Sequence, residues 1–148
     1  MYSILHTVKV DDLDPLYRHI HHAESLKLLE KARLSLLSAV GYSAESLIER
    51  GLFPVIASID VRYLREVTAG TFTVTCERFA VKNRSLLIFQ KLVNDKGKSA
   101  VQATVTSMLF SKQTGRAVAP EPQFAKLFRN LCPDGNWSDL PNLVSAPK

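Results

Sequence analysis

Hydrophobic residues recur with two different periods along this chain. Over residues 23–40 they recur every three or four positions, which predicts an amphipathic helix that ends at Gly41. A second, shorter helix is predicted over residues 44–50, with Ser43 as its N-cap. Elsewhere the hydrophobic residues alternate or form β-branched runs, which are typical of strands. Strands are predicted over residues 2–10, 55–64, 71–81, 85–94 and 99–111.

The connections between the last four predicted strands are short and carry turn residues. Turn signals lie at residues 68–70, 82–84 and 94–97. Because such links join antiparallel neighbours or near neighbours, these strands are expected to form a meander. The predicted architecture is therefore α+β, an antiparallel five-stranded sheet with the one long helix on its face. Such a sheet leaves exposed edges, so we expect the chain to associate with itself.

The length and composition fit one globular domain. Hydrophobic residues make up 46% of the 148 positions, which excludes a disordered chain. We expect the domain to span residues 1–132, with a weaker helix over 123–131 and a loosely ordered tail over 133–148. No apolar run approaches the roughly 20 residues of a membrane-spanning helix, and no signal-peptide pattern is visible. No membrane association is therefore expected.

The cysteines and the charges indicate the environment and the kind of partner. Cys76 and Cys132 lie far apart and have no flanking cations, so we expect neither a disulfide nor a nucleophilic thiol, and a cytoplasmic location. The formal net charge is +5, but the Lys and Arg residues are scattered singly. This pattern argues against nucleic acid and favours a small phosphate-bearing ligand.

Titratable residues gather just before the long predicted helix. Residues 11–22 contain three aspartates and three histidines. The first N–H groups of a helix have no partner inside it, and that end is partly positive, so it can receive a polarised carbonyl oxygen. A carboxylate beside it can attack the carbonyl carbon or activate water. No cysteine or repeated histidine spacing accompanies the histidines, so no metal is expected.

Three segments together resemble a known family. They are Glu-Lys-Ala-Arg at residues 30–33, Ile-Asp-Val-Arg-Tyr-Leu-Arg at residues 59–65 followed by Gly70, and Arg-Ser at residues 84–85. In this order and spacing they resemble acyl-CoA thioesterases of the 4-hydroxybenzoyl-CoA thioesterase type. The resemblance implies the hotdog fold, in which an antiparallel five-stranded sheet wraps around one long central helix. It also implies hydrolysis of an acyl-CoA or acyl-carrier thioester, and we expect no cofactor.

The resemblance also implies a catalytic carboxylate in the loop before the helix. Asp14 is the leading candidate for nucleophile or general base, and Asp12 is the alternative. His22 occupies the position whose backbone N–H faces the thioester carbonyl in the family. His19 is either an acid–base or orienting group, or a side chain that packs against the sheet.

The loop departs from the family pattern. One extra residue separates Asp14 from the helix, and the family's glycine is replaced by Tyr17 or Arg18, so the loop must bend differently. This departure supports a second reading, a non-catalytic hotdog module that binds acyl groups. A third reading is an enoyl-CoA hydratase, because residues 12–16 followed by His19 faintly resemble the motif of hotdog hydratases.

Other candidate residues are cations. Arg65, Lys82 and Arg84 are candidates for binding the phosphates of CoA. Glu30 and Arg33 are read as a structural charge pair within the helix. The resemblance further implies a homodimer or homotetramer, in which a second chain completes the active site.

Overall fold

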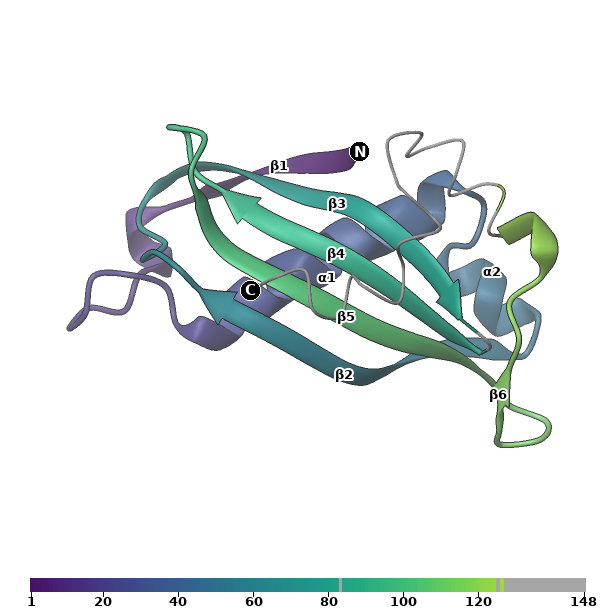
Figure 1. Cartoon of the computed structure of the whole chain (residues 1–148). Coiled ribbons are helices and arrows are strands. Elements are labelled where there is room, and N and C mark those ends of the chain that lie inside the picture. Colours follow the sequence, from purple (N-terminus) through teal and green to yellow (C-terminus); the bar gives the residue numbers. More distant parts are fainter. Residues whose placement is uncertain (83, 125, 127–148) are drawn as a thin grey trace.

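The computed structural model describes residues 1–82, 84–124 and 126 of the chain (Figure 1). Its helices are α1 (His22–Ala39) and α2 (Ala44–Glu49), and its strands are β1 (Tyr2–Val8), β2 (Leu52–Tyr63), β3 (Gly70–Lys82), β4 (Ser85–Val93), β5 (Ser99–Ser111) and β6 (Ala117–Val118). The predicted helices and strands up to residue 111 are confirmed, with ends that shift by at most three residues. The short β6, which pairs with β5, was not predicted.

The strands form one antiparallel sheet in the order β1-β3-β4-β5-β2. The prediction of a four-strand meander is wrong in one respect. β3, β4 and β5 follow one another through hairpins, but β2 lies beyond β5 at the edge of the sheet. The six residues 64–69 make this crossing possible, because six extended residues reach about 20 Å and three strand spacings need only about 14 Å. The backbone N–H groups of Leu64 and Arg65 donate to the Ala100 carbonyl, so the connection passes over the start of β5.

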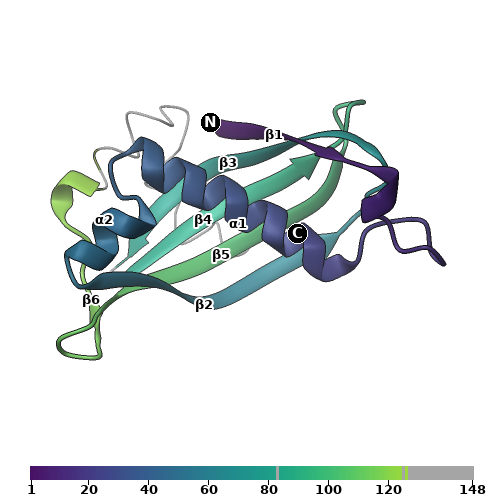
Figure 2. The same cartoon turned by 180° about the vertical axis from the view of Figure 1, so that it is seen from behind.

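The long helix α1 packs its apolar side into the core. It lies across one face of the sheet, as the views from both sides show (Figures 1 and 2). Its buried residues Leu29, Ala32 and Leu36 face inward side chains of the sheet such as Val74 and Val105. Burying one of the larger apolar side chains, such as a leucine or a valine, contributes about 1.5–3 kcal/mol to the stability of the fold. The helix starts one residue earlier than predicted, because the residue before it supplies a side-chain cap.

Helix α1 does not cover the sheet evenly. It packs closest to β3, β1 and β4, and it is further from β2. The partner strand of β2 is β5 alone, so the outer edge of β2 is unpaired in the described part of the chain. This uneven cover leaves space between the helix and the edge strand.

Some of the predictions lie outside the described residues. These are Cys132, the tail over 133–148 and most of the helix predicted over 123–131, of which residues 122–124 and 126 are seen to be helical. Within the described residues, no helix is both long enough and apolar enough to cross a membrane.

Candidate functional site

Asp14 begins a tight turn in the loop before α1. Its Oδ1 accepts the backbone N–H groups of Leu16 at 2.8 Å and Tyr17 at 3.0 Å. The turn closes where the Asp14 N–H donates to the His19 carbonyl, and the Arg18 N–H donates to the Asp14 carbonyl, both at 2.8 Å. The Asp14 side chain is thereby fixed by main-chain groups of its own loop.

Arg18 provides the bend in this loop. Its φ is +64°, and it is the one residue other than glycine with a positive φ in the described part of the chain. That conformation costs an L-residue roughly 1–2 kcal/mol relative to the right-handed region. The loop thus turns at an arginine in a backbone conformation that favours glycine.

The turn also sets the charge of Asp14. The N–H groups of Tyr17 and Leu16 hold the pKa of this carboxyl below its usual value, with a smaller contribution from the nearby His19. Hydrogen bonds to the charged form favour ionisation. Asp14 is therefore a carboxylate at neutral pH, as both a nucleophile and a general base require.

The start of α1 is capped by a histidine. The Nδ1 of His21 accepts the Ala23 N–H at 3.1 Å, and the His21 carbonyl accepts the Glu24 N–H at 2.9 Å. The N–H of His22, the first residue of the helix, has no acceptor among the described residues. It is one of the donors that a helix N-terminus leaves open, so it can donate to a ligand.

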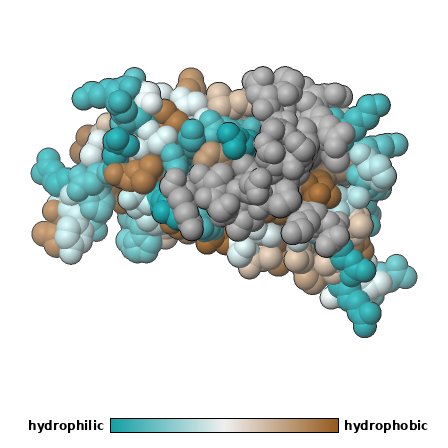
Figure 3. All heavy atoms as spheres, in the orientation of Figure 1, coloured by the Kyte–Doolittle hydropathy of each residue, from teal (hydrophilic) through white to brown (hydrophobic). Residues whose placement is uncertain are grey.

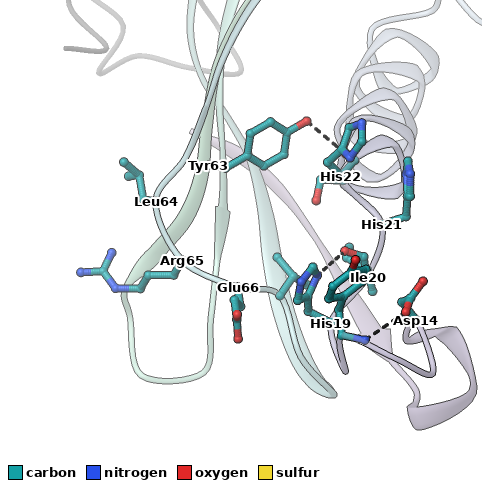
Figure 4. Close-up of a pocket in the computed structure, with 12 residues that line it drawn as sticks. Asp14, His19, Ile20, His21, His22, Tyr63, Leu64, Arg65 and Glu66 are labelled. Atoms are coloured by element: carbon teal, nitrogen blue, oxygen red, sulfur yellow. Dashed lines mark hydrogen bonds between the residues drawn. The ribbon is translucent and has the colours of Figure 1, made fainter.

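A pocket of about 590 Å³ lies at this end of the helix. Its lining consists of Asp14, Tyr17, residues 19–22, Ser25 and residues 63–67. Figure 4 shows the loop and the start of α1 on one side, and the end of β2 with its connection on the other. The two sides are joined by the Ile20 N–H, which donates to the Val67 carbonyl at 3.0 Å. The pocket thus has a wall that hydrogen bonds hold in place.

Tyr63 was not singled out in the sequence, although it belongs to the motif over residues 59–65. Its hydroxyl donates to the His22 carbonyl at 3.1 Å (Figure 4). Its ring lies edge-on to the His22 ring, with 6.2 Å between the two ring centroids. Partial burial raises the pKa of this hydroxyl, so it stays protonated at neutral pH. Tyr63 therefore fixes the first turn of α1 from across the pocket.

His19 lines the pocket with a defined orientation. Its Nδ1 donates to the Ile20 carbonyl at 3.0 Å, because a carbonyl can only accept. In the neutral ring, Nε2 then carries the lone pair. The ring also stacks on Tyr17 at 5.9 Å. Either orienting a ligand or moving a proton at Nε2 is compatible with this position.

The structure brings some of the predicted residues together and separates others. Asp14, His19, His22 and Arg65 all line this pocket, and the Arg65 guanidinium donates to the Ser99 carbonyl at 2.7 Å. Asp12 does not line it. Its carboxylate accepts the Lys9 N–H at 2.8 Å and caps a single 3₁₀ turn, Val10–Asp12.

The two hairpin cations lie elsewhere in the same chain. Lys82 ends β3, and the exposed Arg84 precedes β4, which begins beside Met108. Met108 pairs with Val55, whereas the pocket lies beyond Tyr63 at the other end of β2. Within one chain, the hairpin and the pocket are therefore at opposite ends of the sheet.

No metal centre is visible in the described part of the chain. None of its His, Cys, Asp and Glu side chains form a group of three or more that could hold a metal ion.

The fold agrees with a comparison against protein families. The sequence-family model of the thioesterase-like superfamily matches residues 8–128. The chain belongs to this superfamily, and its architecture is the hotdog fold. Among curated proteins, none matches the chain significantly. The narrower resemblance to the 4-hydroxybenzoyl-CoA thioesterase type stays a prediction.

Solved structures share the fold at low sequence identity. A hypothetical protein from Staphylococcus aureus, in complex with CoA, has a TM-score of 0.81 and 20% identity over 91% of this chain and 85% of its own. A thioesterase from Thermus thermophilus, complexed with coenzyme A and Zn, has a TM-score of 0.73 and 24% identity over 88% of this chain and 92% of its own. A Lactobacillus plantarum protein assigned as an oleoyl thioesterase has a TM-score of 0.79 and 16% identity over 86% of this chain, which spans 50% of that protein.

Proposed function

We propose that this chain hydrolyses an acyl-CoA or acyl-carrier thioester to the free acid. The observation that carries the proposal is the placement of Asp14 and of the open His22 N–H on one pocket. Membership in the thioesterase-like superfamily supports the reaction class. The CoA in two of the similar structures supports CoA as the thiol part of the substrate.

Each residue then has a defined role. The thioester oxygen accepts a hydrogen bond from the His22 N–H, aided by the partly positive helix terminus. The Asp14 carboxylate attacks the carbonyl carbon directly, or it takes a proton from the water that attacks. In the direct route the carbon–sulfur bond breaks, the thiolate leaves, and the mixed anhydride formed on Asp14 is then hydrolysed by water to the carboxylic acid. In the water route the carbon–sulfur bond breaks after water has added, and the proton held by Asp14 passes to the leaving thiolate. Tyr63 keeps the helix start in position through the His22 carbonyl.

One observation favours a second function, a non-catalytic acyl-binding module. Both N–H groups that Asp14 accepts belong to its own turn, which is also what a purely structural aspartate would do. In that case the helix terminus would bind the carbonyl of the acyl group, and Asp14 would neither attack it nor activate water. An enoyl-CoA hydratase would instead consume the double bond of its substrate and release no CoA.

We also propose a homodimer formed along β2. Twelve residues of this strand present an unpaired edge, and Phe53, Ile56 and Tyr63 are exposed along it. Figure 3 shows hydrophobic side chains along the lower rim of the molecule, beside the hydrophilic turn between β5 and β6. Pro54 is tolerated there because an edge strand does not need every N–H. A long apolar edge of this kind calls for a partner.

A dimer of this kind would give the hairpin cations a role. If the two β2 strands pair antiparallel, the Val55 end of the partner's strand lies at the Tyr63 end of this one. The hairpin that carries Lys82 and Arg84 is level with the Val55 end. It would thus reach toward the pocket of the other chain, where cations suit CoA phosphates. A homotetramer could then form from two such dimers.

Turnover measured on a panel of thioesters tests the proposed function. Purified protein is incubated with acyl-CoA substrates of varied acyl groups, and free thiol and remaining acyl-CoA are followed separately. Thiol release in proportion to acid formation is expected. Saturable binding of acyl-CoA without thiol release would establish the binding module instead, and loss of a double bond without thiol release would establish the hydratase.

A further inference from the structure

A second pocket lies further along the same helix, beside a buried arginine. It holds about 230 Å³ and lies between α1, the edge strand β2 and the face of β4. Its walls are largely apolar, with Leu37, Ile56, Leu86 and Ile88 among them. Arg33 contributes the guanidinium and is only 7% exposed.

Arg33 uses few of its donors within the described part of the chain. Its Nη1 donates to Gln90 Oε1 at 2.9 Å, and this is its one hydrogen bond among the described residues, although the group has five N–H donors. Glu30 was expected to pair with it, but Glu30 is exposed and lies beyond the 4.0 Å of an ion pair. Burial lowers the pKa of Arg33, and the attraction of Glu30 offsets part of that effect.

The surroundings hold the guanidinium in place. Gln90 is fully buried, and its Nε2 donates to the Leu29 carbonyl at 3.0 Å and to Cys76 Sγ at 3.2 Å. The Gln90 amide is therefore fixed from both the helix and the sheet. It orients Arg33 toward the pocket while leaving most of its donors unused. The other guanidinium nitrogens of Arg33 are not among the buried unpartnered atoms of the described residues, so they are open to solvent and can donate to an anion that enters the pocket.

The position along α1 relates this pocket to the first one. Arg33 lies eight residues after Ser25, which lines the pocket at the helix N-terminus, so the two are about 12 Å apart along the helix axis. Both pockets lie on the side where α1 leaves β2 uncovered. An acyl group whose thioester is held at the helix N-terminus would have to extend about 12 Å along α1 to bring its far end to Arg33.

We propose that the Arg33 pocket binds a carboxylate at the far end of the acyl group, so that ω-carboxyacyl thioesters are preferred over plain alkyl thioesters. This inference rests on the proposed function and specifies its substrate class. The guanidinium supplies a planar fork that matches a carboxylate. The Glu30 carboxylate at the rim opposes an anion weakly, because it faces solvent.

Binding of two matched probes tests the inference. The probes are non-hydrolysable thioether analogues of an ω-carboxyacyl-CoA and of the methyl-terminated acyl-CoA of equal length, titrated by calorimetry over several chain lengths. Wild-type protein is expected to bind the carboxylate probe at least about tenfold more tightly, as a charged hydrogen-bonded pair allows. Arg33→Met is expected to abolish this preference while still binding the methyl-terminated probe, and Glu30→Gln is expected to strengthen it.

The possible outcomes separate the two proposals. Equal binding of both probes by the wild type, or a preference that survives in Arg33→Met, would overturn the Arg33 site and leave the thioesterase proposal standing. Failure of both probes to bind would overturn both. If Arg33→Met does not fold, Arg33→Lys replaces it. That variant keeps the charge but loses the fork, so the preference is expected to fall in it without loss of the melting transition.

Discussion

At the scale of single residues, Arg18 occupies a backbone conformation that usually favours glycine. Its backbone adopts φ +64° between the two main-chain hydrogen bonds that close the Asp14 turn. The left-handed region suits glycine, whereas any side chain with a Cβ is strained there. The strain is a property of the backbone, so it does not depend on the guanidinium.

This strain predicts a ranking of two substitutions. Arg18→Gly is expected to be more stable than Arg18→Ala by about 1 kcal/mol, because alanine keeps the strain and glycine removes it. Urea unfolding followed by circular dichroism would measure the difference. An alanine variant as stable as the glycine variant would show that the turn is not strained at this position.

The depressed pKa of Asp14 predicts a dependence of stability on pH. Since the folded pKa lies below the unfolded value, its stabilising effect is fully present above the unfolded pKa and is lost as pH falls through the folded pKa. The difference in melting temperature between wild type and Asp14→Asn is therefore expected to be constant near neutral pH and to shrink in the acid range below about pH 4. A difference that stays the same from pH 6 to pH 2 would contradict this origin of the pKa shift.

The sequence could place Asp14 at the site but could not describe its surroundings. The carboxylates and the helix that follows them predict a charged group at a helix N-terminus. The contacts to the Leu16 and Tyr17 N–H groups depend on a bend that residue spacing did not reveal. The role of Tyr63 could not be predicted for a related reason, because its hydrogen bond to His22 joins residues 41 positions apart in the sequence.

At the scale of the elements, α1 begins with an unusual N-cap. The imidazole of His21 accepts the Ala23 N–H in the place where Ser, Thr, Asp or Asn is preferred. The same cap sets which N–H group is left open toward the pocket. Stability and the geometry of the site therefore depend on one side chain.

Substitutions of His21 are expected to separate these effects. His21→Ala should destabilise the protein by about 1 kcal/mol, and His21→Asp should restore or exceed the original stability, because carboxylates are better caps and favour the positive helix end. Ser43→Ala, which removes the Ser43 cap of α2, is the matched control. Equal stability of His21→Ala and wild type in thermal unfolding would mean that this cap contributes nothing.

The elements themselves were more predictable than their arrangement. Periodicity located β2 and β3 to within three residues, because apolar and polar residues alternate along part of each strand's sequence. It did not reveal that β2 lies at the edge beyond β5, since a connection of six residues is long enough either to form a turn or to cross the sheet. The pockets depend on that crossing, so their place could not be predicted from the sequence.

At the scale of the whole molecule, the unpaired edge of β2 is where the proposed dimer would form. A β2-to-β2 interface would bury the exposed apolar side chains of this edge and bring the Arg84 hairpin toward the other chain's pocket. Obligate interfaces bury on the order of 2,000 Å² or more. The pocket and the assembly would then be parts of one structure.

Light scattering on edge variants tests the assembly. The wild type is expected to show at least twice the 16.5 kDa mass of one chain at micromolar concentration. Ser58→Lys, in the middle of β2, should weaken the dimer, because lysine on an edge opposes strand pairing. Ser3→Lys, on the other edge strand β1, is the matched control and should leave the mass unchanged. A wild type that is monomeric at this concentration would contradict the dimer.

The most direct test of the central claim is the turnover number of Asp14→Asn. Asparagine keeps the oxygen that accepts the Leu16 and Tyr17 N–H groups, so the turn and the fold should persist, but it cannot act as a nucleophile or base. We predict a fall in kcat for acyl-CoA hydrolysis of at least ~10²–10⁴, the usual contribution of a general base. In the wild type, the Asp12 carboxylate caps a 3₁₀ turn away from the pocket. The Asp12→Asn variant should therefore retain nearly full kcat. Full thioesterase activity in a folded Asp14→Asn protein would contradict the account.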